Sequence, residues 1–337
     1  MRDEQERFVN SNGPTAVTVI VCAFNAAATI FATLVSLRAQ THQVLEILII
    51  NDGSTDATNE IVRQQAEEDG RIRMLDNDGN RGTAYSRQRG LEEASNDLVM
   101  FFDADDLAEP DLVNSQIRLI ESDKRILGVG CYARYFSDVS EDTDLGLQRI
   151  GPTNREEFMT LYRNNKLMFM VPVTLFKRGH ALTVGGYRQK LMPNPQGTRY
   201  EDFAEDLDLW CRLSDLGVEG MYFITIPKPL FRYRKPVDSL STRNLKFMQL
   251  KMRWIKDCLC RRRAGIPERT LEAFIASRGA VDRFLDWRAD IGAGFFRRGA
   301  FAYSRRDYPA LAFFLMLAGI ASPKLLIQKF RTQRMGR

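Results

Sequence analysis

The stretch Leu98-Val99-Met100-Phe101-Phe102-Asp103-Ala104-Asp105-Asp106 joins an apolar run directly to three carboxylates. A continuous apolar run of this kind predicts a strand that is covered on both faces of a sheet. Two of the carboxylates follow it with Asp-x-Asp spacing, so the strand delivers them to one edge of the sheet. Such oxygen ligands suit a hard divalent cation, which can in turn hold a diphosphate. A solvated turn after a strand is the competing interpretation, and the neighbouring sequence decides between the two.

Strand-like and helix-like segments alternate around this stretch. The expected strands cover 16–23, 45–50, 71–75 and 98–102, and the expected helices cover 27–39, 57–69 and 82–94. This alternation predicts right-handed β-α-β units that build a parallel sheet. Ligands of such sheets bind beyond the carboxyl ends of the strands. The loops after Val21, Ile50 and Phe102 all lie at that edge, so they predict one site there.

The composition fits a globular protein with one large domain and an appendage. The chain has 337 residues, of which 44% are hydrophobic and 27% are charged. Five cysteines without zinc-ligand spacing and two distant histidines, His42 and His180, argue against a zinc site and a histidine-based triad. Reduced thiols, and an N-terminus (1–10) without the apolar core of a signal peptide, predict a cytoplasmic protein.

The charge is divided unevenly along the chain. Residues 243–337 carry 21 Lys and Arg but 7 Asp and Glu, whereas the whole chain has a net charge of +5. This region is expected to be helical, and its apolar run over 308–321 is shorter than the roughly 20 residues needed to span a bilayer. The run either packs as a hairpin against the rest of the chain or lies in the interface of an anionic membrane. No nucleic-acid-binding motif is recognised here.

The middle of the chain, 128–233, is expected to mix helices and strands. A helix is predicted over 205–213 and a late strand over 230–234. The segment Gly128-Val129-Gly130 lacks the third glycine of a dinucleotide-binding loop and opens no clear helix, which argues against a Rossmann oxidoreductase.

Six segments of the chain share their order and spacing with one known family. They are 19–25, 51–56, 80–82, 102–106, 204–210 and 231–234. With this set the sequence resembles a family 2 glycosyltransferase of the GT-A fold, of the type that builds bacterial surface polysaccharides. Each segment alone is weak support, whereas six in register are strong support.

The resemblance implies an α/β fold of the GT-A nucleotide-diphospho-sugar transferase kind, with a Rossmann-like, mainly parallel sheet and a C-terminal helical appendage. It covers about residues 16–242. The expected layout is an N-terminal extension (1–15), a catalytic domain (16–242) with a nucleotide-sugar-binding half (16–127) and an acceptor-binding half (128–242), and a basic helical region (243–337) that can associate with a membrane.

Three residues match family positions that bind the donor nucleotide. Phe24 matches an aromatic ring that stacks on the base, usually uracil, although a core phenylalanine at a strand end is the alternative. Asp52 matches a carboxylate that accepts a hydrogen bond from the base N3–H. Arg81 matches a basic residue near the base and the diphosphate, with an exposed loop arginine as the alternative.

The Asp-x-Asp segment matches the family's metal site. The resemblance implies that Asp103 and Asp105 share a Mg²⁺ or Mn²⁺ ion and the ribose, with Asp105 the preferred direct ligand and Asp106 in support. The cation neutralises the departing UDP, so the leaving group needs no proton. Many relatives carry a histidine after the late strand, where this chain has Lys235-Pro236; Arg234 or Lys235 is the candidate replacement.

Asp206 matches the family's catalytic base, which deprotonates the acceptor hydroxyl. Glu205 beside it is expected to bind the acceptor or support the base. Carboxylates in a first helical turn are also common caps, and Glu201-Asp202 competes for the same role. One base and no evident nucleophile imply single displacement with inversion.

The sequence therefore predicts a UDP-sugar-dependent transferase that acts on a lipid-linked or polysaccharide glycan at the inner face of the cell membrane. A catalytically silent sugar-nucleotide-binding subunit of a glycan assembly complex is the alternative. Retention of both the Asp103/Asp105 and the Glu205/Asp206 pairs argues against that alternative, because a binding protein needs no base.

Overall fold

The protein is described by a computed structural model over residues 15–137, 144–192, 197–235, 245–304 and 307–323. The expected N-terminal extension lies outside the described residues except for residue 15. So do the expected boundary at 242/243 and Pro236 of the segment that replaces the family's histidine.

Four parallel strands form the first half of a mixed sheet, as the alternation of apolar runs predicts. They are β1 (Val17–Ala23), β2 (Leu45–Asn51), β3 (Ile72–Asp76) and β4 (Leu98–Asp103). β1 lies between β2 and β4, and β3 pairs with β2. The intervening helices are α1 (Ile30–Arg38), α2 (Thr58–Glu68) and α3 (Thr83–Glu93). β1, β2 and β4 are almost entirely buried, which explains their largely apolar sequences, whereas β3 at the edge of the sheet is mostly half-buried.

The second half of the sheet is mixed in direction. The strand order is β3-β2-β1-β4-β8-β6-β9-β5, and β7 pairs with β6. β8 is antiparallel to both β4 and β6, whereas β9 runs parallel to β6. These strands are β5 (Leu107–Ala108), β6 (Ile126–Ser137), β7 (Asp144–Gln148), β8 (Leu175–Lys177) and β9 (Tyr222–Lys235).

The expected late strand over 230–234 is only the end of β9, which begins at Tyr222. Pro227 and Pro229 lie inside this strand, although proline cannot donate a hydrogen bond to a ladder. The strand tolerates them because its register against β6 shifts around Tyr132, where Pro229 is the paired residue. Such irregularities are where prolines are accommodated within sheets.

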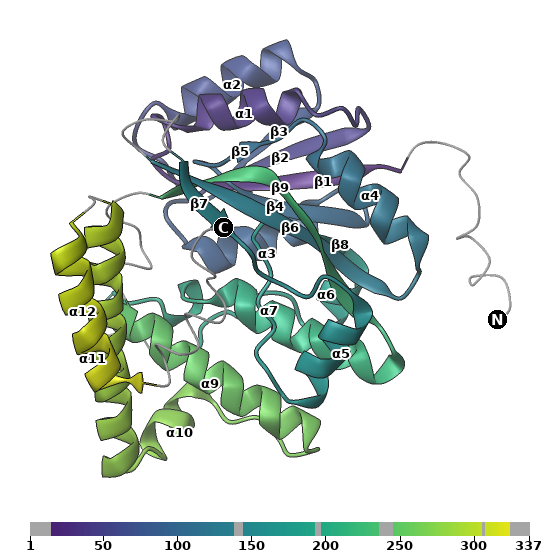
Figure 1. The fold of residues 1–337 in the computed structure, drawn as a ribbon. Coiled ribbons are helices and arrows are strands. Elements are labelled where there is room, and N and C mark those ends of the chain that lie inside the picture. The colour runs from purple at the N-terminus through teal and green to yellow at the C-terminus, as the bar shows by residue number, and fades with distance from the viewer. Residues whose placement is uncertain (1–14, 138–143, 193–196, 236–244, 305–306, 324–337) are drawn as a thin grey trace, which may run out of the picture.

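Helices cover the sheet on both sides. Figure 1 shows α1 and α2 on one side, and α7 and α9 on the other, with α11 and α12 as an antiparallel pair at the flank. The remaining helices are α4 (Leu112–Ser122), α5 (Arg155–Arg163), α6 (Arg178–Thr183), η1 (Tyr200–Asp202), α7 (Glu205–Leu213), η2 (Ser214–Glu219), α9 (Leu245–Arg263), α10 (Leu271–Ala276), α11 (Ala280–Ser304) and α12 (Tyr308–Ala321).

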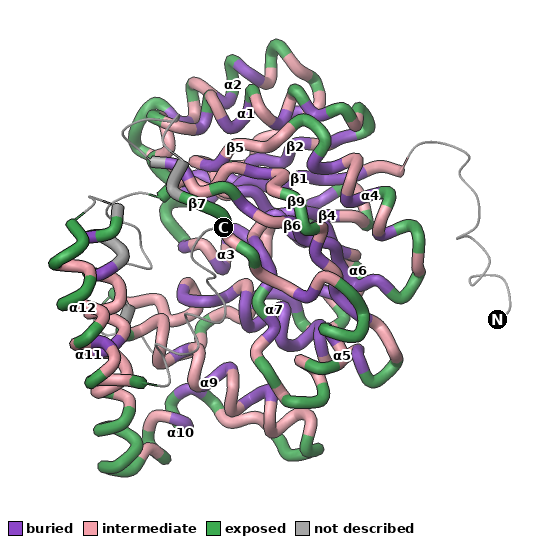
Figure 2. Tube along the Cα trace, in the orientation of Figure 1, coloured by how far each residue is buried: buried purple, intermediate pink, exposed green. Residues whose placement is uncertain are grey.

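The first helix of the basic region, α9, is part of the main core. Trp254, Ile255, Cys258 and Leu259 are buried and belong to the same hydrophobic cluster as the strands, as Figure 2 shows by the buried stretches along α9. The Trp254 indole also donates a 2.8 Å hydrogen bond to the Arg269 carbonyl. α9 is therefore held by core packing.

The helix that matches the apolar run, α12, packs against α11. The Phe295 and Phe314 rings stack with centroids 6.5 Å apart, and Gly299 of α11 lies close to Leu311 and Phe314. Phe313, Met316 and Ile320 remain more than half exposed on α12. None of the helices within the described ranges is long and apolar enough to cross a membrane.

Replacing Trp254 with alanine should lower the free energy of unfolding by about 3–5 kcal/mol, because the substitution leaves a large cavity in the core. The matched control is Trp287→Ala on α11, where the indole is 57% exposed and the expected change is within about 0.5 kcal/mol. Urea unfolding of both variants measures the difference. Equal losses would show that α9 is not part of the cooperative core.

Candidate active site

Three loops meet at the carboxyl edge of the parallel strands. In the sheet register, Ala23 of β1 lies beside Asn51 of β2, and Cys22 lies beside Asp103 of β4. The residues that follow these positions are therefore brought together from three separate parts of the sequence. This convergence is the one predicted from the apolar runs.

Asp52 organises the neighbouring loop. Its buried carboxylate accepts hydrogen bonds from the Asn77 side chain at 2.6 Å, from the Arg81 backbone N–H at 2.9 Å and from the Gly82 backbone N–H at 2.9 Å. Gly53 has a positive φ of 74°, and a Cβ there would lie 2.5 Å from the Gly79 backbone. Only glycine permits this close approach, so the Asp52 carboxylate is held rigidly at the strand end.

Phe24 directly follows β1, and Arg81 lies in the loop before α3, where its backbone N–H donates to Asp52. The Phe24 side chain is 48% exposed, so the alternative of a core phenylalanine is wrong. Arg81 forms an ion pair with Asp78 at 3.1 Å and lies 4.7 Å over the Tyr85 ring. The roles of Phe24, Asp52 and Arg81 toward a nucleotide stay predictions.

The three carboxylates after β4 sit in a tightly held turn. The Asp106 carboxylate accepts a 2.8 Å hydrogen bond from the Arg234 backbone N–H, and the Arg234 guanidinium donates to the Asp105 carbonyl at 2.8 Å. Burial, and then the Asp103 and Asp105 carboxylates, raise the pKa of the Asp106 carboxyl well above its usual value. Its second oxygen is buried without a hydrogen-bonding partner among the described residues.

This turn has the chemistry of a cation site but few protein ligands. Carboxylate oxygens are the ligands that Mg²⁺ and Mn²⁺ prefer. Asp103 and Asp105 lie close enough to Asp106 to raise its pKa, and a cation at this turn would offset the repulsion among the three carboxyl groups. The described ranges hold no group of three or more His, Cys, Asp or Glu side chains placed to bind a metal ion. Any cation held here would need ligands from a bound diphosphate or water.

Arg87 of α3 connects this turn to the start of α7. Its buried guanidinium lies 3.2 Å from an Asp103 oxygen and 3.0 Å from a Glu205 oxygen. The sequence interpretation missed this residue. The available signal was its position, since Arg87 falls on the same helix face as the buried Ala84 and Leu91, where a charged side chain requires buried partners.

The backbone before α7 directs Glu205 and Asp206 into the site. Ala204 is in the left-handed region with φ 49° and ψ 39°, a conformation that costs a non-glycine residue about 1–2 kcal/mol. Burial raises the pKa of the Glu205 carboxyl to about 7; the Arg87 guanidinium opposes this shift and Asp206 adds to it. Asp206 is half-buried, and one carboxylate oxygen accepts from the Leu207 N–H at 2.7 Å.

Asp202, the alternative candidate for the base, takes part in a hydrogen bond within the fold. Its side chain accepts a 2.9 Å hydrogen bond from the Ala84 N–H in the first turn of α3. A Cβ on Gly82, whose φ is 96°, would come within 2.3 Å of the same carboxylate. Because the Asp202 carboxylate already accepts a hydrogen bond at the N-terminus of α3, it is a weaker candidate for the base than Asp206.

Two further groups that the sequence interpretation missed lie near Glu205. The Tyr187 hydroxyl is buried without a hydrogen-bonding partner in the described part of the chain, and burial raises its pKa well above the usual value. Burial also raises the pKa of the Cys22 thiol to about 12. Cys22 therefore stays protonated at neutral pH and does not supply a thiolate nucleophile.

Comparison with known families and proteins agrees with this geometry. Residues 18–181 match the family described as Glycosyl transferase family 2. An uncharacterized glycosyltransferase of Haemophilus influenzae is 30% identical over 223 residues, which are 65% of each chain. The putative glycosyltransferase EpsH of Bacillus subtilis is 35% identical over 129 residues, 38% of this chain and 37% of the relative. The chain thus spans less than two thirds of these relatives.

Solved structures with the same fold are more distant in sequence. TarS 1–349 of S. aureus, in complex with UDP-GlcNAc, has a TM-score of 0.52 and 13% identity, with 90% of this chain and 91% of TarS covered. The mannosyltransferase PcManGT of Pyrobaculum calidifontis, in complex with GDP-Man and Mn²⁺, has a TM-score of 0.52 and 18% identity, with 92% and 87% covered. These likenesses confirm the predicted GT-A-like α/β fold with C-terminal helices.

The raised pKa of Glu205 predicts a pH-dependent stability. Its folded value of about 7 lies above the unfolded value of about 4.5, so the folded state binds more protons between these values. Stability from this group is therefore present below about pH 4.5 and is lost as the pH rises through about 7, by an amount on the order of 1–3 kcal/mol. Glu205→Gln should remove this loss.

Thermal unfolding between pH 5 and pH 8 measures the effect. The wild type should lose more stability over this range than Glu205→Gln, whereas the control Glu67→Gln, exposed on α2, should follow the wild type. Parallel curves for the wild type and Glu205→Gln would contradict the raised pKa.

Proposed function

The chain belongs to glycosyl transferase family 2, a class of enzymes that transfer a sugar from a nucleotide sugar, and we propose that it uses a UDP-sugar and a glycan acceptor. One observation carries the proposal. Arg87 joins Asp103 in the turn after β4 to Glu205 at the start of α7, so the candidate donor site is linked by ion pairs to the residue beside the candidate base.

The donor base would lie beside Asp52 and Phe24. The exposed Phe24 ring offers a stacking surface, and the Asp52 carboxylate, fixed by three hydrogen bonds, would accept from the N3–H of uracil. Cytosine lacks that donor. The UDP-GlcNAc bound by TarS and the UDP-Glc named for the relative WfaP of Escherichia coli support uridine, whereas the GDP-Man of PcManGT makes guanosine the competitor to test.

Asp105 and Asp103 are the residues that would hold a Mg²⁺ or Mn²⁺ ion, with the diphosphate completing its ligands. When bound, such a cation supplies a positive charge that stabilises the departing nucleoside diphosphate. Asp103 is also held by Arg87, and the Asp105 backbone by Arg234. These contacts fix the turn before any ligand arrives, so little reorganisation is needed on binding.

Asp206 is the proposed base. It would take the proton from the acceptor hydroxyl while the hydroxyl oxygen attacks the anomeric carbon, opposite the leaving UDP. This single displacement inverts the anomeric configuration. Glu205 cannot serve equally well because Arg87 occupies its carboxylate at 3.0 Å. Glu205 and Arg87 would instead orient the start of α7 toward the donor.

The acceptor is proposed to be lipid-linked or part of a polysaccharide, reached at the cytoplasmic face of the membrane. The relative WfaP is named for transfer to GlcNAc-diphosphoundecaprenol, and another relative is a cholesterol galactosyltransferase of Borreliella burgdorferi. In this chain, α12 carries no charged residue over 308–321 and exposes apolar side chains. The arginines of α9 are less suited to lipid, since Arg253, Arg262 and Arg263 pair with acids of the chain itself.

Release of UDP from UDP-GlcNAc and UDP-glucose with Mn²⁺ tests the proposal. Asp206→Asn should keep the UDP affinity of the wild type and lower kcat by about 10²–10⁴-fold, because it removes proton transfer only in the transition state. Asp202→Asn is the matched control and should mainly lower the melting temperature through its contact with α3.

The outcomes separate the alternatives. A loss of turnover in a stable Asp202→Asn variant, with normal Asp206→Asn activity, would move the base to Asp202. Nucleotide binding without turnover in the wild type, across both donors and added lipid acceptors, would favour the silent binding subunit.

A further inference from the structure

The basic helix α9 places one lysine inside the protein, beneath the start of α7. Lys251 is 1% exposed, and its ammonium donates a 2.8 Å hydrogen bond to the Glu201 carbonyl in η1. A lysine side chain is almost never buried to this extent without compensating partners. The buried charge of Lys251 therefore requires compensating groups of opposite charge nearby.

Four carboxylates on two elements interact electrostatically with this ammonium. They are Glu205, Asp206 and Asp208 of α7, and Asp202 of η1. Burial lowers the pKa of the Lys251 ammonium, and these four carboxylates act in the opposite direction. Lys251 in turn opposes the burial-driven rise in the pKa of Glu205, as Arg87 of α3 does from the other side. Glu205 thus faces Arg87 on one element, Lys251 on another and Asp206 beside it.

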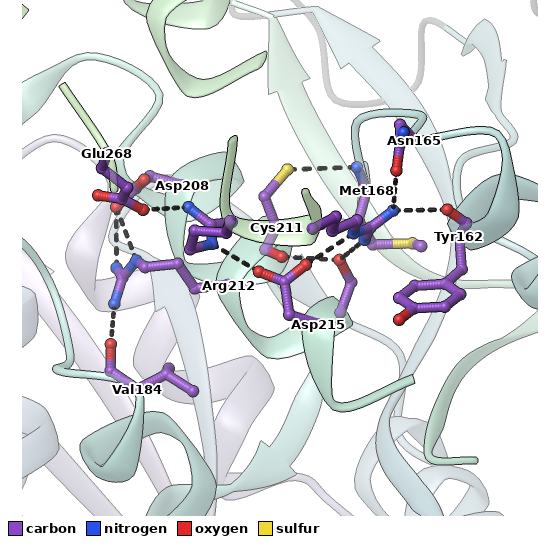
Figure 3. A network of polar contacts seen from close by, with 12 residues as sticks. Tyr162, Asn165, Met168, Val184, Asp208, Cys211, Arg212, Asp215 and Glu268 are labelled. Atoms are coloured by element: carbon purple, nitrogen blue, oxygen red, sulfur yellow. Dashed lines mark hydrogen bonds and ion pairs between the residues drawn. The ribbon is translucent and has the colours of Figure 1, made fainter. Parts of the chain in front are cut away.

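α9 cannot easily move away from this position. Towards its end, Arg262 and Arg263 form ion pairs with Asp215 of η2 at 2.6 and 2.8 Å. Figure 3 shows Asp208, Arg212, Asp215 and Glu268 in the polar network that connects α7 and η2 with the chain around α9. Core packing of Trp254 and Ile255 adds to these pairs. The position of Lys251 is therefore set by contacts in the middle and at the C-terminal end of α9.

We propose that Lys251 is a positioning residue of the active site, which anchors the Glu201 carbonyl and supplies positive charge beneath the Glu205–Asp206 pair. The proposal rests on the function proposed above. Its consequence is that the basic C-terminal region contributes to the catalytic centre itself, through a residue that touches neither donor nor acceptor. Its positive charge opposes the burial-driven rise in the pKa of Glu205.

The test compares Lys251→Met, which keeps the length of the side chain and removes its charge, with Lys251→Arg and the control Lys256→Met. Lys256 lies on the same helix and donates to the backbone carbonyl of Asn165, whereas Lys251 donates to that of Glu201. UDP release from UDP-GlcNAc and UDP-glucose with Mn²⁺ is followed from pH 5 to pH 9, together with UDP affinity.

Lys251→Met should lower kcat at least 10-fold with UDP affinity unchanged. The acidic limb of its pH profile should move to higher pH, because carboxylates without a nearby cation are harder to ionise. Lys251→Arg should recover at least part of kcat, and Lys256→Met should match the wild type. A Lys251→Met enzyme with wild-type kcat and pH profile would overturn the proposal.

A second measurement needs no substrate and so separates this proposal from the proposed function. The melting temperature of Lys251→Met, relative to the wild type, should be lower at pH 8.5 than at pH 5.5, because the uncompensated carboxylates repel one another when ionised. A pH-independent difference would overturn the charge role of Lys251. Absence of UDP release in the wild type, with the pH-dependent difference present, would contradict only the proposed function.

Discussion

The buried ion pairs of Arg87 are the interaction on which the rest of the site depends. Asp103 of β4 and Glu205 of α7 both lie close to the same guanidinium, and like charges brought near one another repel. The Arg87 guanidinium lies within 3.2 Å of both Asp103 and Glu205 and offsets this repulsion. The Arg87–Glu205 pair is buried on both sides, and removal of one partner from such a pair costs about 3–5 kcal/mol. Arg87 thereby connects the sheet edge to the start of α7.

The charge of these carboxylates also explains why helix α9 of the C-terminal region packs beside the proposed active site. The first turn of α7 carries three acids, Glu205, Asp206 and Asp208, and Lys251 of α9 interacts electrostatically with all three. The arginines at the end of α9 pair with Asp215, and Arg188 joins Asp208 to Glu268 at 3.0 and 2.7 Å. The basic character that suggested a separate membrane-binding tail therefore serves, in α9, to neutralise acids of the same chain.

The sequence predicted what depends on local pattern. The strand over 98–102 and the helix over 82–94 are close to the observed β4 and α3, because apolar runs and helical periodicity are local properties. Asp52 and Asp103 were identified because they follow such runs and match motifs of the family that the sequence resembles. The roles of Arg87 and Lys251 were not identified, because their partners are distant in sequence and the neighbouring residues do not indicate them. The Asp202 contact with Ala84 spans 118 residues and is set by tertiary packing alone.

The central claim is that the carboxylates at this sheet edge form a cation-dependent site for uridine diphosphate. Calorimetric titration of UDP, with and without Mn²⁺, into the wild type and Asp105→Ala measures it directly, with GDP and CDP as competitors. The account predicts binding of UDP that needs Mn²⁺, that exceeds the binding of GDP and CDP, and that is lost in Asp105→Ala. Equal UDP affinity in the wild type and Asp105→Ala, or a preference for GDP, would contradict it.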